Sequence, residues 1–250
     1  MATEALNSWT DRFRRDGYFH FEQLLPPAPV ETARQAISRD VDQHFDPGRL
    51  IEYNNRSWCP GLRDSRPIKN LFKNKAVQAV TDKALGKDRY RWDNGQIAIR
   101  HAHSAEKAYE PAAHIDGIPT PTNGMQGTEI QNFTALAGVF LTEVKSDFAG
   151  NFTVWPGSHL ILEQYFRERG KTALGNGMPN VPIGDPVQLR TKPGDVVLCH
   201  YQLAHSAAVN TSDDDRIAIF FRLWFNGISG PEKGEQRWHN LTHIWDGWQI

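Results

Sequence analysis

The first third of the chain places its apolar residues mainly at the three- and four-residue spacing of amphipathic helices. Leu6, Trp9 and Phe13 are an example, with charged residues between them. The pattern predicts a helix, a short strand, a second helix, an irregular stretch and a third helix, at residues 5–16, 18–21, 29–44, 46–67 and 67–85. The irregular stretch is rich in Pro, Gly, Asn and Arg, and it is either a loop that covers a pocket or only a long connection.

From Tyr90 onward the spacing of apolar residues changes to two, the period of strands. The stretch 133–144 is nearly all apolar, which predicts a strand buried on both faces. Further strands are predicted at residues 96–101, 151–155, 187–190, 195–199, 203–209 and 217–225, with a helix at 159–170 and a Gly/Pro-rich loop at 171–186. Helices first and many strands later favour a sandwich or barrel of antiparallel strands backed by N-terminal helices.

The length favours one domain, with a helical part at about 1–88, a strand-rich core at about 89–226 and a C-terminal extension at 227–250. The 28 basic and 29 acidic residues nearly cancel, so we expect neither nucleic acid nor an anionic membrane as a partner. No apolar run reaches the ~20 residues that a membrane-spanning helix needs.

Cysteine content and the N-terminus bear on the compartment. The chain has two cysteines, Cys59 and Cys199, which lie far apart, and its first residues lack the apolar centre of a signal peptide. We therefore expect a reduced, cytoplasmic protein. The 8 Trp and 13 Phe predict a core or pocket rich in aromatic rings.

The candidate chemistry begins at a His and an Asp two residues apart, His114 and Asp116. On an extended stretch they lie on the same side of the backbone. With a second His from elsewhere they form the two-His-one-carboxylate set that binds Fe(II) and leaves three coordination positions for substrates and oxygen. The motif alone is weak, because a strand-end His beside a solvated Asp is common.

The second His has two candidates, His200 and His205, in the segment 193–222. Their separation is odd, so on one straight strand they face opposite ways, and only one reaches a metal without a bulge.

The strand that follows begins at Arg216 and has two different faces. One face holds Arg216, Ala218, Phe220 and Arg222, and the other is entirely apolar. The apolar face is expected to pack against helices or a second sheet, and the mixed face to line a cavity. An arginine inside a barrel is costly unless an anion meets it, and its planar fork fits a carboxylate. Arg216 therefore either pairs with the far carboxylate of an iron-chelating 2-oxo acid or is a surface arginine beside the acidic turn 213–215.

The combined motifs run over most of the chain in a specific order: Asp16-Gly17-Tyr18, His114-Ile115-Asp116, Gly150, Trp155-Pro156-Gly157-Ser158-His159, Gly194-Asp195, His205, Asn210-Thr211-Ser212 and Arg216. In this the chain resembles the phytanoyl-CoA dioxygenase (PhyH-like) family of Fe(II)/2-oxoglutarate-dependent oxygenases. The resemblance implies a mainly β fold with helices, whose core is a double-stranded β-helix (a jelly roll, cupin-like) backed by N-terminal helices.

The same resemblance implies the site and the reaction. The metal ligands would be His114, Asp116 and His205, and His200 would not be a ligand. Arg216, eleven residues after His205, would bind the distal carboxylate of 2-oxoglutarate. With Fe(II), 2-oxoglutarate and O2, such an enzyme hydroxylates or desaturates an unactivated C–H bond of a small organic molecule, and 2-oxoglutarate becomes succinate and CO2. Related halogenases replace the carboxylate ligand by a small residue, so Asp116 argues against halogenation.

The chain departs from the family pattern at two positions. Ala207 stands where relatives often have a hydroxyl that helps hold the distal carboxylate, and Ile115 stands where they often have Gln. Other polar groups must then hold the head of the 2-oxo acid, and Gln96, Arg100 and Thr134 on neighbouring strands are the candidates. His159 is expected to be structural.

The substrate is the least constrained part of the prediction. The aromatic content suits a partly apolar small molecule, and three arginines of the irregular stretch either meet an anionic group or are simply solvated: Arg56, Arg63 and Arg66. Three C-terminal tryptophans are expected to pack on the helices: Trp238, Trp245 and Trp248. Two alternative functions remain open: a non-catalytic metal-binding jelly-roll sensor, and a cupin-type metal enzyme independent of 2-oxoglutarate.

Overall fold

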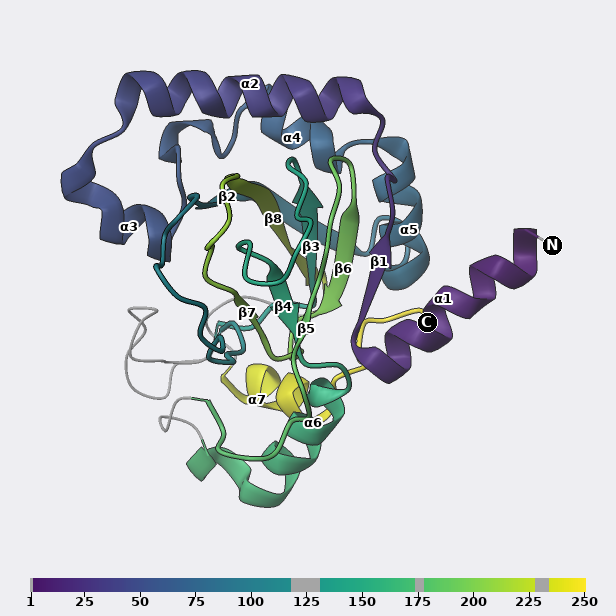
Figure 1. The fold of residues 1–250 in the computed structure, drawn as a ribbon. Coiled ribbons are helices and arrows are strands. Elements are labelled where there is room, and N and C mark those ends of the chain that lie inside the picture. Colours follow the sequence, from purple (N-terminus) through teal and green to yellow (C-terminus); the bar gives the residue numbers. More distant parts are fainter. Residues whose placement is uncertain (1, 118–130, 174–177, 228–233) are drawn as a thin grey trace.

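The computed structural model describes residues 2–117, 131–173, 178–227 and 234–250 (Figure 1). Its helices are α1 (Ala2–Asp16), α2 (Pro27–His44), α3 (Leu50–Asn55), α4 (Arg66–Phe72), α5 (Lys75–Leu85), α6 (Ser158–Arg169) and α7 (Gly234–Thr242). Its strands are β1 (Tyr18–Phe21), β2 (Tyr90–Arg100), β3 (Ala135–Phe140), β4 (Phe152–Val154), β5 (Val187–Gln188), β6 (Val196–His200), β7 (His205–Ala207) and β8 (Arg216–Phe225).

The strands form two antiparallel sheets. The larger has the order β1-β6-β3-β8-β2 and the smaller the order β5-β4-β7. The strand β1, from the N-terminal part of the chain, pairs with β6 and forms one edge of the larger sheet. This arrangement of two facing antiparallel sheets with helices confirms the predicted jelly-roll architecture.

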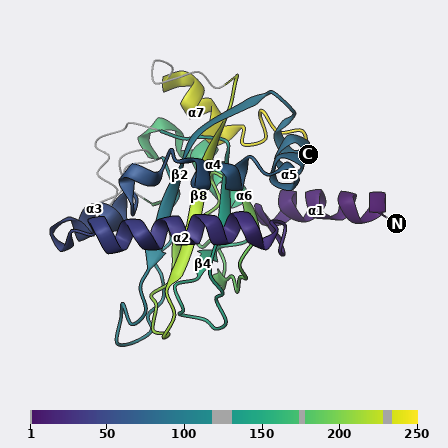
Figure 2. The same ribbon diagram turned by 90° about the horizontal axis from the view of Figure 1, so that it is seen from above.

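The two faces of the larger sheet pack against different layers, as the alternation along β8 predicts. Its outer face contributes Ile219, Phe221 and Leu223 to a core shared with α4, where Ile68 and Phe72 are fully buried. Figures 1 and 2 show α2, α4 and α5 on this side of the molecule, with α6 and α7 at the other end of the strands. The inner face packs against the smaller sheet and α6 in a second core. The strand β3 is buried at every position, as predicted.

The prediction of a single helix over residues 67–85 is wrong, because the structure contains two helices there. The helix α4 ends at Phe72, and α5 begins after Asn74, whose side-chain oxygen accepts a hydrogen bond from the Ala76 amide at 2.9 Å. An Asn at this position satisfies an amide that the first helical turn leaves unpaired, so it starts a new helix.

We expect Asn74→Ala to lower the free energy of unfolding by about 1 kcal/mol, because it removes this cap. Urea unfolding followed by circular dichroism measures the change. The matched control is Asn74→Asp, which keeps an acceptor oxygen and should unfold within a few tenths of a kcal/mol of the original protein. Equal stability of the Ala and Asp variants would contradict the assignment of Asn74 as a cap.

Candidate metal centre

The segment before Asp116 adds an extended strip to the edge of the smaller sheet. His114 and His205 form an antiparallel bridge, with the His114 amide donating to the His205 carbonyl at 3.0 Å and the His205 amide donating back at 2.9 Å. Ile115, between the two predicted ligands, is fully buried in the inter-sheet core. This backbone geometry directs His114 and Asp116 to the same side and brings His205 beside them.

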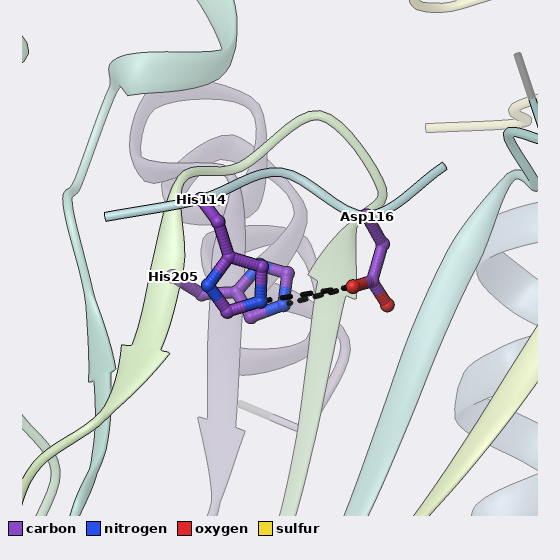
Figure 3. A group of neighbouring side chains, drawn as sticks. All are labelled: His114, Asp116 and His205. Atoms are coloured by element: carbon purple, nitrogen blue, oxygen red, sulfur yellow. Dashed lines mark ion pairs between the residues drawn. The ribbon is translucent and has the colours of Figure 1, made fainter. Parts of the chain in front are cut away.

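Figure 3 shows the three side chains converging. His114 Nε2 lies 3.7 Å and His205 Nε2 lies 3.8 Å from Asp116 Oδ1. One donor atom from each residue lies within 4.8 Å of the other two, and no other such cluster of His, Cys, Asp or Glu occurs in the described parts of the chain. Two imidazole nitrogens and one carboxylate oxygen at this spacing fit one face of an octahedral Fe(II) ion.

The orientation of the His205 ring is fixed by a hydrogen bond to the backbone. Its Nδ1–H donates to the Leu203 carbonyl at 2.9 Å, so Nε2 carries the free electron pair and faces Asp116. The motif Trp155–His159 holds Ala204, the residue before His205. The Ala204 amide donates to Ser158 Oγ, and the Trp155 amide donates to the Ala204 carbonyl. That element therefore orients one of the candidate ligands.

Burial and nearby charges keep two of the donors, Asp116 and His114, in their ligand forms. Burial alone would raise the pKa of Asp116, but nearby positive charge, that of Arg222 first, outweighs it and holds that pKa well below its usual range. Burial lowers the pKa of His114 to about 4, so its imidazole is neutral at pH 7. An ionised carboxylate and a neutral imidazole are the forms that bind a divalent metal.

Arg222 is the closest partner of the carboxylate. Its Nη2 donates to Asp116 Oδ2 at 2.7 Å, and its Nη1 donates to Gln96 Oε1 at 2.7 Å. One carboxylate oxygen is thus occupied by Arg222, while Oδ1 faces the histidines. The sequence places Arg222 on the cavity face, but its partner depends on how the segment around Asp116 lies over the sheet.

The three donors line a cavity of about 490 Å³ between the sheets. Its walls combine aromatic and aliphatic groups with three arginines: Phe152, Phe220, Leu136, Met178, Arg100, Arg216 and Arg222. Such a mixture of apolar walls and a few polar groups is typical of a small-molecule site. The helix α3 contributes Tyr53, Asn54 and Asn55, so part of the irregular stretch 46–67 does cover the pocket.

Arg216 is 2% exposed and lies in this cavity. Its Nε donates to the Gly150 carbonyl at 2.7 Å and its Nη1 to the Ala98 carbonyl at 3.1 Å. Among the described residues, no carboxylate pairs with it. Burial, and then repulsion from Arg100, lower the pKa of Arg216 to about 9. The guanidinium is therefore a buried cation with no anion from the described residues, rather than a surface arginine paired with the acidic turn.

The remaining predicted contacts fall into two groups. Gln96 and Arg100 line the cavity. Thr134 does not, because it is buried and its hydroxyl accepts a hydrogen bond from the Phe225 amide. The arginines of the irregular stretch also lie outside the lining: Arg56, Arg63 and Arg66.

His200 and His159 occupy structural positions. The Nε2–H of His200 donates to the Ile244 carbonyl at 2.7 Å and its Nδ1 accepts from the Gln202 amide, so neither nitrogen is available to a metal. His159 donates to the Arg14 carbonyl. Its ring, that of His200 and the rings of Trp245 and Trp248 form one cluster, in which Trp248 stacks on His200.

The fold and the candidate site together define a jelly-roll enzyme with a two-His-one-carboxylate metal centre. The sequence matches the family Phytanoyl-CoA dioxygenase (PhyH) over residues 13–218, most of the chain. The chain therefore belongs to the phytanoyl-CoA dioxygenase family of Fe(II)/2-oxoglutarate-dependent oxygenases, which confirms the resemblance. No curated protein sequence matches the chain.

Solved structures share the fold at low identity. SnoN, a non-heme alpha ketoglutarate dependent epimerase from nogalamycin biosynthesis, has a TM-score of 0.61 and 22% identity over 89% of this chain and 84% of its own. HygX from Streptomyces hygroscopicus with nickel, 2-oxoglutarate and hygromycin B bound has a TM-score of 0.59 and 18% identity over 89% and 88%. The non-heme monooxygenase ThoJ has a TM-score of 0.57 and 21% identity over 86% and 76%.

Two further observations complete the description. Among the described helices, none has the length and apolar content to cross a membrane. Cys59 and Cys199 are both buried and unbridged.

Proposed function

We propose that this protein is a dioxygenase that hydroxylates or desaturates an unactivated C–H bond of a small organic molecule, with Fe(II) bound by His114, Asp116 and His205. Its cosubstrate is 2-oxoglutarate, with Arg216 as the partner of the distal carboxylate. The observation that carries this proposal is the buried, uncompensated Arg216 in the same cavity as the three metal donors. A metal site alone fits many reactions, whereas a metal site plus a buried carboxylate receptor fits a dicarboxylic 2-oxo acid.

The bound iron, with 2-oxoglutarate and O2, supplies the oxidation of the C–H bond, and 2-oxoglutarate leaves as succinate and CO2. The chain's own residues bind and orient. Arg216 anchors one end of the cosubstrate, so that its 2-oxo acid end lies toward His114 and Asp116. Phe152, Phe220 and Leu136 exclude water from the reacting region. Arg222 keeps Asp116 oriented, with one oxygen toward the metal position.

The substrate is proposed to occupy the part of the cavity beside α3. There Tyr53, Asn54 and Asn55 present an aromatic ring and two amides. These groups suit a small molecule with both apolar and hydrogen-bonding parts. A structural neighbour, HygX, has hygromycin B bound, which supports a small molecule as the substrate.

The proposed function is tested by anaerobic titration of the protein with Fe(II) and 2-oxoglutarate. We expect a weak visible charge-transfer band that forms only when both are present, decays when oxygen is admitted, and leaves succinate in the solution. The same protein loaded with Zn(II) is the control, because it binds the cosubstrate without redox chemistry.

The alternatives give different results in this experiment. A non-catalytic sensor would show the band but no succinate after oxygen is admitted, even with a library of candidate substrates. A cupin-type metal enzyme independent of 2-oxoglutarate would bind Fe(II) without the band. Either result would refute the proposed function.

A further inference from the structure

A second arginine lies directly opposite Arg216. In the pairing of β2 with β8, Arg100 is the cross-strand partner of Arg216, and both side chains line the cavity. Directly opposite residues of an antiparallel pair have Cβ atoms about 4.5–5.5 Å apart, and like charges in that position destabilise the sheet. The protein therefore places the stems of two arginines side by side, and the charge of Arg100 acts on Arg216.

Neither guanidinium is compensated by a residue that the structure describes. Arg100 Nη1 donates to the Ile99 carbonyl at 3.3 Å, and Arg216 Nε and Nη1 also donate to backbone carbonyls. No carboxylate in the described residues forms an ion pair with either group. Burial lowers the pKa of Arg100, as it does for Arg216. A buried cation beside a half-buried one, with no anion from the described residues, costs free energy, and an anionic ligand removes that cost.

The stems of both arginines are fixed from the opposite sheet by Gly150. A Cβ atom on Gly150 would lie 2.8 Å from the Arg100 Cβ and 3.1 Å from the Arg216 Cβ, so only glycine fits there. The Gly150 carbonyl accepts from Arg216 Nε. The backbone of Arg100 is held as well, because Asn210 Nδ2 donates to its carbonyl at 2.9 Å. The backbone and stem of Arg100, and the stem and Nε of Arg216, are thus held in place beside each other.

We propose that Arg100 and Arg216 together form a two-guanidinium clamp for one carboxylate, the distal carboxylate of 2-oxoglutarate. This assignment rests on the proposed function. It moves Arg100 from the expected contact with the 2-oxo acid head to the far end of the cosubstrate. It also supplies the contact that Ala207 lacks, since Ala207 lines the same cavity but has no hydroxyl. Each guanidinium donates to the carboxylate, which carries the charge that both require.

The test compares two cosubstrates that differ only at the far end. 2-Oxovalerate has the same 2-oxo acid head and chain length as 2-oxoglutarate but ends in a methyl group. Their dissociation constants are measured by anaerobic titration of the Fe(II)-loaded protein, followed by tryptophan fluorescence. The ratio of the constant for 2-oxovalerate to that for 2-oxoglutarate reports the carboxylate contact alone.

We expect Arg100→Gln to reduce this ratio by about tenfold or more. The substitution should weaken the binding of 2-oxoglutarate, while the dissociation constant of 2-oxovalerate changes by less than about twofold. The matched control is Arg91→Gln, because Arg91 lies on the same strand but is exposed and outside the cavity lining. A thermal melt checks folding, and Arg100→Met, which keeps the packing of the stem, replaces the Gln variant if that one does not fold.

The outcomes separate this inference from the proposed function. If the original protein binds 2-oxoglutarate far more tightly than 2-oxovalerate and Arg100→Gln keeps the full ratio, the clamp is refuted while the proposed function stands. An anionic group of the substrate would then be the partner of Arg100. If the original protein does not distinguish the two acids, both proposals fall.

Discussion

Asp116→Ala is expected to lower the affinity for Fe(II) by about 100-fold or more and to abolish turnover. The substitution removes the anionic member of the three-donor set, and two neutral imidazoles are left to bind a dication. It also exposes the metal position to Arg222, whose charge Asp116 neutralises at 2.7 Å in the intact protein. The loss therefore combines a missing ligand with a newly uncompensated cation beside the metal.

Equilibrium dialysis against Fe(II) under anaerobic conditions measures this effect, and succinate formation measures turnover. Asp147→Ala is the matched control, because Asp147 is an exposed carboxylate that pairs with Arg190 and does not line the cavity. The control should bind iron and turn over as the original protein does. If the Asp116→Ala variant still bound one iron per protein at low micromolar Fe(II), the metal site would lie elsewhere.

Much of the inner surface of the site follows from alternation along β8. Arg216 and Phe220 point into the cavity, and Phe221 points into the core shared with the helices, as period two requires. The odd separation of His200 and His205 likewise matches their opposite environments, one against Ile244 and the other beside His114. These features depend only on local backbone geometry, so a sequence pattern can carry them.

The features that the sequence did not reveal depend on distant pairings. Arg222 meets Asp116 across a separation of 106 positions, and no local pattern selects that partner. Arg100 faces Arg216 because β2 pairs with β8 in one register, and a shift by one residue would turn one of them outward. The break between α4 and α5 was missed for another reason, since the apolar spacing continues through the Asn74 cap.

Arg216→Met is expected to lower the affinity of the Fe(II)-loaded protein for 2-oxoglutarate about 100-fold, a larger loss than Arg100→Gln causes. Arg216 is the more deeply buried of the two arginines. In the variant, little water can therefore reach the distal carboxylate of 2-oxoglutarate to replace the lost guanidinium donors. Binding of 2-oxovalerate should change little, because methionine retains an apolar stem beside the methyl end. Saturating 2-oxoglutarate should raise the thermal midpoint of the original protein but not that of the variant at the same concentration.

The comparison with Arg216→Lys tests whether geometry or charge matters at this position. Lysine keeps the positive charge but offers a point donor in place of the planar fork, so we expect it to recover only part of the affinity. If Arg216→Met bound 2-oxoglutarate as tightly as the original protein, the carboxylate receptor would have to be another cavity arginine. Arg222 is poorly placed for that role, because both of its Nη groups already donate to Asp116 and Gln96. The variant thus decides whether Arg216, a buried cation without a carboxylate partner among the described residues, binds the cosubstrate.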